Sequence, residues 1–366
     1  MSDDTTPPPR SLSRSGTSRR RFLEGTALAA VGTSAAALVG AQATPAGSAS
    51  KPTSCPTIAT PMKDVEGKVA FITGGNSGIG LGIARAFVDA GMKVVITYRT
   101  KSNLDEAMKY LESAGNRVHA VSVDVTDRAA MDKAAEETVK VFGKVHVIVN
   151  NAGVAVVGGL SKASFEDWDW GMGVNVNGVF NGIRSFLPRI QSHGEGGAVI
   201  ATSSLAGLLG HGTAGVYTAS KFAVVGMMEA LRFELADTNI GVNCFCPGIV
   251  NTNISASARN RPAAAGAGTP GPATPGRPPR GPMPGMDALE AGQRVLKGMR
   301  NNDLYILTTP DFEPDFRARG EAILASLPTD VTPTDARIAV GHAIAGKMTY
   351  IAERDRKVCE RATRKA

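Results

Sequence analysis

The most constraining feature of the chain is a short apolar run that ends in a glycine-rich turn and continues as a helical pattern. Residues 68–73 are rich in β-branched and aromatic side chains and predict a strand. Residues 74–80 form the glycine turn, and apolar residues from Ile83 onward recur at helical spacing. Such a turn lets the backbone approach a pyrophosphate at a helix N-terminus. The motif alone is weak evidence, but its place between strand and helix predicts a nucleotide site.

Strand and helix patterns alternate from residue 68 to residue 247, which favours an α/β fold. We expect a Rossmann-like doubly wound parallel sheet, in one domain with a C-terminal extension that is helical after residue 329. At 366 residues the chain exceeds one such unit, so the surplus is assigned to its ends and to one insertion rich in Pro, Gly and Ala. The expected parts are a signal peptide at 1–43, a linker at 44–62, a catalytic domain at 63–327 with an insertion at 255–286, and an extension at 328–366. For the insertion there are two hypotheses, a substrate lid and a disordered expansion without function.

The end of the second expected strand, at residues 94–98, bears on the choice of nucleotide. In such folds an acidic residue near this point binds the ribose 2′-hydroxyl, about twenty residues after the glycine turn. This chain has Tyr98 and Arg99 there, with Lys101 nearby. A guanidinium pairs well with a 2′-phosphate, so NADP(H) is favoured over NAD(H). The alternative for Arg99 is a solvated loop charge.

Tyr217, Lys221 and Ser204 supply groups for proton transfer. Residues 217–234 predict a helix, on which Tyr217 and Lys221 share one face. A nearby ammonium should lower the pKa of a phenol from its ordinary value of about 10 and make Tyr217 a general acid/base. The Ser204 hydroxyl could hold a substrate oxygen. Ordinary pairing on a helix surface is the alternative for the short motif taken alone.

In their order along the chain, these motifs resemble the short-chain dehydrogenase/reductase family. The resemblance runs from about residue 63 to residue 254, more weakly to about 327, and rests on residues 73–80, 124–125, 150–153, 175, 204, 217–221 and 247–248. It implies an NAD(P)-binding enzyme acting on CH–OH groups. The implied catalytic residues are Ser204, Tyr217, Lys221 and Asn175, the last holding a water of the proton relay. The implied cofactor-binding residues are Thr73, Gly74, Asn76, Ser77, Gly78, Ile79, Gly80, Tyr98, Arg99, Asp124, Val125, Asn151, Ala152, Gly153, Tyr217, Lys221, Pro247, Gly248, Val250 and Thr252.

The predicted partner is a small alcohol or carbonyl compound, because the candidate pocket segments 154–160 and 205–211 are largely apolar. Their main titratable group is His211, which is more typical of a loop residue than of a catalyst. The family resemblance implies a homodimer or homotetramer through helices such as 165–187 and 217–235. The alternative function is a nucleotide-binding redox sensor or scaffold without turnover. Oxidation followed by epimerisation or elimination is a third hypothesis, less favoured by the motif spacing.

The N-terminus has the features of an export signal. Arg19 and Arg20 precede Phe22 and a small, mildly apolar run at 25–39, and residues 41–43 have a small-x-small form. This resembles a twin-arginine signal, whereas a spanning helix needs about 20 strongly apolar residues. We expect export to the periplasm or the exterior, no stable membrane span after cleavage, and a tightly held cofactor. An arginine-rich tail on a cytoplasmic protein is the alternative.

Charge and cysteine content exclude other classes. A net charge of +7 with 5% aromatic residues lacks the pattern of a nucleic-acid-binding protein. Cys244 and Cys246 lie two apart in an expected strand, which predicts packed side chains on one face, and no metal site is expected because further ligands are missing nearby. Cys55 and Cys359 complete the set. Disulfides could form after export, but their pairing stays open.

Overall fold

The computed structural model describes residues 55, 58–262, 285–344 and 347–364. The expected signal peptide at 1–43, most of the linker at 44–62 and most of the insertion at 255–286 lie outside the described residues. These three assignments therefore stay predictions.

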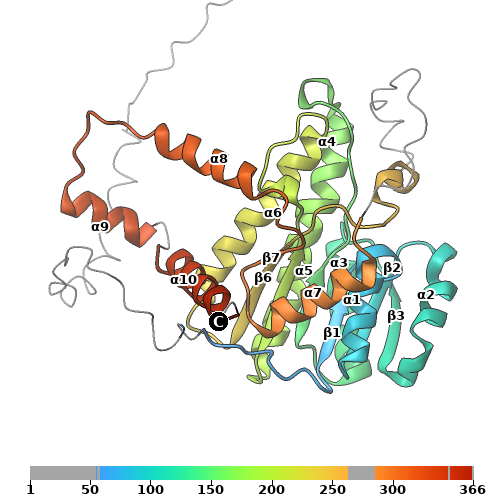
Figure 1. The fold of residues 1–366 in the computed structure, drawn as a ribbon. Helices are drawn as coiled ribbons and strands as arrows, with labels where there is room; N and C mark the ends of the chain where they lie inside the picture. Colours follow the sequence, from blue (N-terminus) through green and yellow to red (C-terminus); the bar gives the residue numbers. More distant parts are fainter. Residues whose placement is uncertain (1–54, 56–57, 263–284, 345–346, 365–366) are drawn as a thin grey trace, which may run out of the picture. The chain divides into compact units, whose positions relative to one another are not determined.

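Seven strands form one parallel sheet in the order β3-β2-β1-β4-β5-β6-β7 (Figure 1). The register pairs Ile72 with Ile96 on one side and with Val149 on the other. Most of the strands read as continuous buried apolar runs, as expected for a parallel sheet covered on both faces. The order reverses direction between β1 and β4, where doubly wound sheets bind nucleotides. The strands are β1 Val69–Ile72, β2 Lys93–Tyr98, β3 Val118–Ser122, β4 Val147–Asn150, β5 Gly197–Thr202, β6 Ile240–Cys246 and β7 Tyr305–Leu307.

Helices cover both faces of the sheet, which confirms the predicted fold class. Those described are α1 Gly78–Asp89, α2 Leu104–Tyr110, α3 Arg128–Phe142, α4 Phe165–Met172, α5 Gly178–Ser192, α6 Gly215–Glu234, α7 Ala288–Arg300, α8 Glu313–Ala325, α9 Asp335–Ile344 and α10 Lys347–Arg364. Side-chain caps fix several starts: Asp127 accepts from the backbone of α3, and Asp287 accepts from that of α7. Ser164 and Asp167 form a reciprocal capping box on α4.

The core has two main parts, one on each face of the sheet. One packs β-strand residues such as Phe71 against α3, α5 and α6, and includes Phe186 and Met228. The other packs residues such as Ile96 against α1, α2 and α7, and includes Phe87. Both faces of the sheet are therefore buried, and only its edges and strand ends are left to carry a site.

The helical prediction for 165–187 needs one refinement. The segment is interrupted between α4 and α5 by a π-helical turn, Gly173–Asn177, in which Asn175 is completely buried. Wider turns of this kind are frequent at functional sites. The helical prediction for the tail after residue 329 is confirmed by α9 and α10.

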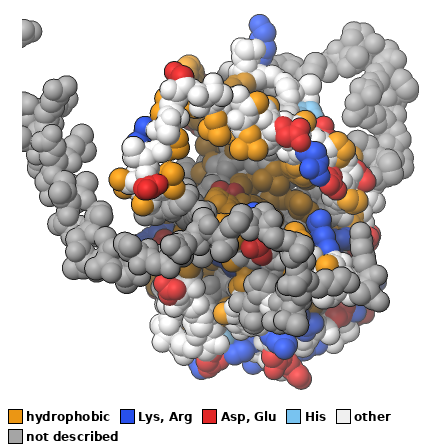
Figure 2. Space-filling view, turned by 60° about the vertical axis from the view of Figure 1, so that its left-hand side comes forward, with side chains coloured by type: hydrophobic (Ala, Val, Ile, Leu, Met, Phe, Trp, Pro, Cys, Tyr) orange, Lys and Arg blue, Asp and Glu red, His pale blue; other side chains and the backbone are white. Residues whose placement is uncertain are grey.

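Helices α8, α9 and α10 lie on the side of the molecule that Figure 2 brings forward. Hydrophobic side chains border a hollow on this face, with charged groups around it. Leu324 in α8 and Val340 in α9 are 66% and 56% exposed. Within the described parts of the chain, no helix is both long and apolar enough to cross a membrane.

Candidate active site

The glycine turn is held by a small set of polar side chains at the ends of β1, β2 and β4. The Thr73 hydroxyl accepts from the backbone N–H groups of Asn151 and Ala152 at 2.8 and 2.9 Å. The Asn151 amide donates to Thr73 O at 3.1 Å, and the Thr97 hydroxyl accepts from Gly74 N at 2.9 Å. The turn is thus fixed against three strands before any ligand arrives.

Two glycines of the turn are required by geometry. Gly74 has φ of +61°, which disfavours other residues. A Cβ on Gly80 would lie 2.2 Å from the Gly74 carbonyl oxygen and 2.6 Å from Asn151 Nδ2. The first turn of α1 therefore packs so closely against the strand ends that no Cβ fits at Gly80. The N-terminus of α1 faces a cleft, and a helix N-terminus in this position is suited to binding a pyrophosphate.

That cleft has a volume of about 460 Å³ and is lined by residues from the ends of β1, β2, β4, β5 and β6. Its size falls within the usual range for a cofactor or small-molecule pocket. Ser204, Tyr217 and Lys221 line the same cleft as the glycine turn. A nucleotide held at the turn and a reacting oxygen held at Tyr217 would share one space.

The proposed catalytic side chains come from two elements. Ser204 stands before the short 3₁₀ turn η6, Leu205–Gly207, and its hydroxyl accepts from Ala206 N at 3.1 Å. Tyr217 and Lys221 lie one turn apart on α6, and the Lys221 ammonium lies 5.5 Å from the centre of the Tyr217 ring. Lys221 Nζ donates to Thr202 O at 2.8 Å. The predicted helix and shared face are confirmed.

The pKa values of this pair differ from the sequence expectation. Burial raises the pKa of the Tyr217 phenol, and its hydrogen bond with Ser204 opposes that rise. Burial also lowers the pKa of Lys221 to about 8, against smaller opposing effects of Cys244 and Cys246. The expected lowering of the Tyr217 pKa by Lys221 is therefore not found. Loss of solvent around the two groups is the largest cause of both pKa shifts.

Asn175 ties the π-helical turn to the loop after β4. Its Oδ1 accepts from Val154 N at 2.8 Å, and its Nδ2 donates to Val154 O and to the Ser220 hydroxyl, both at 2.9 Å. The Ser220 hydroxyl in turn donates to Tyr217 O at 2.7 Å. Both amide hydrogens are thus used within the protein. Asn175 holds the backbone of the catalytic helix, and its part in a water relay stays a prediction.

Arg99 lies at the end of β2 on the rim of the cleft and is exposed. Its Nη2 donates to Asn260 O at 2.6 Å, at the end of the 3₁₀ segment η7, Ile254–Asn260. Arg99 therefore lines the cleft as expected and also contacts the start of the expected insertion.

The described start of that insertion is packed, whereas its composition suggested a stretch that buries little. Ser257 is 2% exposed and its hydroxyl accepts from Ala155 N at 2.9 Å. Arg261 pairs with Asp167 of α4 at 2.5 Å and lies over the Trp170 ring at 5.2 Å. Two polar contacts that sequence periodicity does not reveal hold η7 beside the cleft.

Most of the predicted cofactor residues line the cleft. The predicted residues that line it are Gly74, Asn76, Ser77, Gly78, Ile79, Tyr98, Arg99, Asp124, Val125, Asn151, Ala152, Gly153, Pro247, Gly248, Val250 and Thr252, and their role in holding the cofactor stays a prediction. Thr73, Gly80 and Asn175 lie behind the lining and support it. His211 is exposed, contacts Thr213 at 3.1 Å and is not among the residues that line the cleft, which agrees with a loop histidine.

Three hydroxyl residues were missed by sequence reasoning. Ser220 links Asn175 to α6, and the Ser203 hydroxyl donates to Lys221 O at 2.8 Å. Ser257 anchors η7. Ser203 and Ser220 stand next to the motif residues Ser204 and Lys221, which is the only sequence signal for them. Ser257 has no such neighbour, and its partner Ala155 lies 102 residues away.

Comparison with known proteins agrees with this geometry. Residues 68–263 match the family described as short chain dehydrogenase. A C alpha-dehydrogenase of Sphingobium sp. strain SYK-6 is 34% identical over 310 residues, covering 81% of this chain and 99% of the relative. The chain belongs to the short-chain dehydrogenase/reductase family. It is an NAD(P)-binding oxidoreductase of this family.

Two further members of the short-chain dehydrogenase/reductase family bear on the cofactor. A crystal structure of a member from Burkholderia phymatum in complex with NAD superposes with a TM-score of 0.65 at 33% identity, covering 74% of this chain and 99% of that one. An NADP-dependent (R)-specific alcohol dehydrogenase of Lentilactobacillus kefiri is 40% identical over 194 residues, which is 52% of this chain and 76% of the relative. The family thus includes relatives named for each nucleotide.

Proposed function

We propose that this chain is an NADP(H)-dependent oxidoreductase that interconverts a secondary alcohol and a carbonyl compound, with Tyr217 as general acid/base. The observation that carries the proposal is the shared cleft, which is lined both by Ser204, Tyr217 and Lys221 and by the glycine turn before α1. The side chains Val154, Val174 and Ile254 add apolar surface to it. The substrate class that fits is a small, mainly hydrophobic alcohol or ketone.

The residues of the chain have separate tasks in this reaction. When bound, NADP(H) accepts or supplies the hydride at the substrate carbon. The Ser204 hydroxyl hydrogen-bonds the substrate oxygen and orients it. The Tyr217 phenol gives its proton to a carbonyl oxygen during reduction, and the phenolate takes it from the hydroxyl during oxidation. Lys221, held by Thr202 O, keeps a cation beside the phenol.

Arg99 is proposed to favour NADP(H) by pairing with its 2′-phosphate. Arg99→Ala should lower kcat/KM for NADP⁺ by about 10–100-fold, because charge-assisted hydrogen bonds are worth about 1.5–3 kcal/mol. Activity with NAD⁺ should change by less than about threefold, since its 2′-hydroxyl carries no charge for Arg99 to pair with. The check is a comparison of initial rates with the two nucleotides. An equal loss with both would show that Arg99 supports the loop and not the phosphate.

We also propose that the chain is exported by the twin-arginine route. The structure joins Cys55 to Cys359 in a disulfide, and disulfides persist chiefly in oxidising compartments. Changing Arg19 and Arg20 together to lysine in the full chain should retain the precursor in the cytoplasm. The matched control changes Arg10 and Arg14 to lysine, and cell fractionation reads the outcome. Normal export of the Arg19 and Arg20 variant would refute the proposal.

A further inference from the structure

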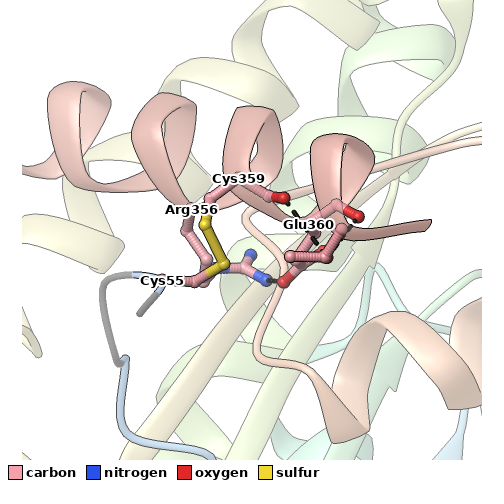
Figure 3. Close-up of a disulfide and its surroundings, with 5 residues drawn as sticks. Cys55, Arg356, Cys359 and Glu360 are labelled. Carbon is pink, nitrogen blue, oxygen red and sulfur yellow. Dashed lines mark hydrogen bonds and ion pairs between the residues drawn. A yellow bond between two sulfur atoms is a disulfide. The ribbon is translucent and has the colours of Figure 1, made fainter. Parts of the chain in front are cut away.

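The two ends of the described chain are crosslinked. Cys55 lies ahead of the first strand and Cys359 lies on α10, 304 residues later, with Cα atoms 5.6 Å apart (Figure 3). That separation is ordinary for a disulfide. Cys244 and Cys246 are buried and free, which confirms the prediction of packed thiols. The crosslink thus joins two segments that lie outside the family's matched range.

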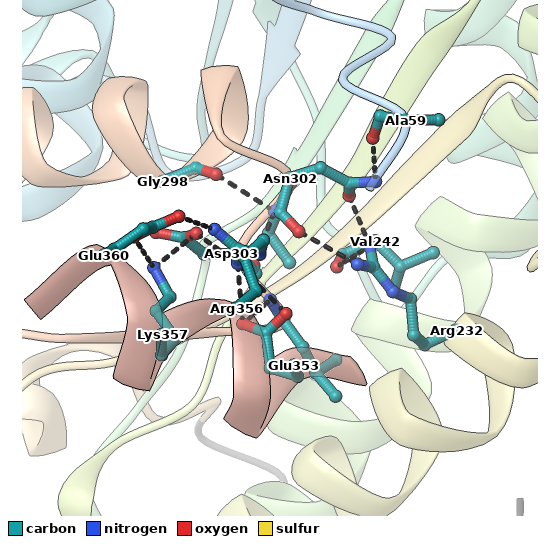
Figure 4. Close-up of polar contacts among 12 residues, drawn as sticks. Ala59, Arg232, Val242, Gly298, Asn302, Asp303, Glu353, Arg356, Lys357 and Glu360 are labelled. Carbon is teal, nitrogen blue, oxygen red and sulfur yellow. Dashed lines mark hydrogen bonds and ion pairs between the residues drawn. The ribbon is translucent and has the colours of Figure 1, made fainter. Parts of the chain in front are cut away.

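Beside the disulfide, α10 rests on the segment that leads into β7 (Figure 4). Arg356 is 5% exposed and donates to Asp303 at 2.7 Å and to Glu353 at 3.0 Å. Glu353 also accepts from Leu304 N at 3.0 Å. Helix α10 therefore docks beside β7, the last strand of the sheet, through buried charged groups.

The ionic contacts add little net free energy to this docking. A buried ion pair gains little net free energy, because the desolvation of both partners offsets their attraction. Arg356 Nε has no hydrogen-bond partner among the described residues, and a cavity of about 610 Å³ remains between α10, α7 and β7. The ionic contacts set the position of α10, and the disulfide adds a covalent restraint on it.

Helix α10 contacts the catalytic helix directly, and the segment after Cys55 is linked to it through Asn302. Tyr350 of α10 and Tyr305 of β7 donate to Glu229 of α6 at 2.8 and 2.6 Å. Arg232 of α6 donates to Asn302 O at 2.9 Å. Asn302 Nδ2 donates at 2.8 Å to the carbonyl oxygen of Ala59, four residues after Cys55. The C-terminal half of the helix that carries Tyr217 and Lys221 is thus contacted by α10 directly and by the segment after Cys55 through Asn302.

We propose that the Cys55–Cys359 disulfide is a redox lock that holds α10 against β7 and α6. It forms when the two thiols give two protons and two electrons to a disulfide oxidant, such as oxidised glutathione, which becomes two thiols. With both cysteines reduced, α10 is held only by its noncovalent contacts with β7 and α6 and opens readily. The lock depends on neither the substrate nor the cofactor of the enzyme.

The test uses the full chain in buffers of oxidised or reduced glutathione. Peptide mapping after alkylation without reduction should find Cys55 joined to Cys359 in the oxidised sample, with Cys244 and Cys246 unpaired. Hydrogen exchange over 347–364 should then be at least about tenfold faster in the reduced sample, while α1 is unchanged. The Cys359→Ser variant should match the reduced protein in both buffers.

Two results would overturn the lock. One is free thiols at Cys55 and Cys359 in the oxidised sample. The other is equal exchange over 347–364 in both buffers despite the crosslink. Because the buffers are compared on the unaltered chain, the second result stands even if Cys359→Ser does not fold. Loss of dehydrogenase activity is not a readout, so the lock and the proposed function can fail separately.

Discussion

Replacing Tyr217 with phenylalanine should lower kcat for both alcohol oxidation and carbonyl reduction by about 10²–10⁴-fold, the usual contribution of a positioned acid or base. The phenol oxygen is the group lost, while the ring and its packing on α6 remain. NADPH affinity, measured by fluorescence titration, should change by less than about threefold. The effect would then fall on the chemical step and not on binding.

The matched control is Tyr110→Phe. Tyr110 ends α2, is 42% exposed and does not line the cleft. This variant should keep full activity. If Tyr217→Phe retained more than about a tenth of the activity, proton transfer would have to run through another group and the proposed role would be wrong.

The unaltered enzyme should show the pH dependence of a buried phenol. Burial raises the pKa of Tyr217, so the phenolate needed for oxidation is scarce at neutral pH. Oxidation should therefore speed up as pH rises to about 8, by up to about tenfold per pH unit, and above that pH Lys221 loses the positive charge beside the phenol. Reduction uses the protonated phenol and should stay level over the same range. A profile of kcat/KM in both directions checks this, and oxidation rates independent of pH would contradict it.

Replacing Gly80 with alanine should weaken NADP(H) binding by about 10–100-fold and lower the free energy of unfolding by about 1–3 kcal/mol. The added Cβ would lie 2.2 Å from the Gly74 carbonyl, so the glycine turn must move away from α1. Overpacking of a close contact costs an amount of this order. Fluorescence titration and denaturant unfolding give the two quantities.

Gly226→Ala is the matched control for this variant. Gly226 is also helical, but nothing lies within 4 Å of the point that a Cβ would occupy there, so alanine should stabilise α6 by up to about 1 kcal/mol. Its NADP(H) affinity should not change. If Gly80→Ala bound the nucleotide as tightly as the unaltered chain, the turn would not need the backbone contact described here.

Local sequence patterns predicted the sheet core and most of the cleft. The glycine turn, β2 and α6 carry strong periodic or motif signals, and the parallel fold then places their ends together. What the patterns could not give was contact between distant segments. The Asp167–Arg261 pair and the tie from Asn175 to Ser220 join residues whose local sequence suggests only capping or loop roles.

The contacts of the C-terminal extension with distant segments could be predicted even less. Its helices were expected, but no local signal pairs Cys359 with Cys55 or places Arg356 beside Asp303. The prediction that Lys221 lowers the pKa of Tyr217 was wrong for a related reason. Charge proximity can be read from a helical spacing, whereas the extent of burial that governs both pKa values depends on the whole fold.

The most direct test of catalysis follows nicotinamide absorbance while the purified chain is mixed with NADP⁺ and a panel of hydrophobic secondary alcohols. We predict a steady rise in reduced nucleotide with at least one alcohol, dependent on enzyme concentration and absent from Tyr217→Phe. Tight binding of NADP(H) with no turnover across the alcohols and the corresponding ketones would contradict the proposed function and identify a nucleotide-binding sensor.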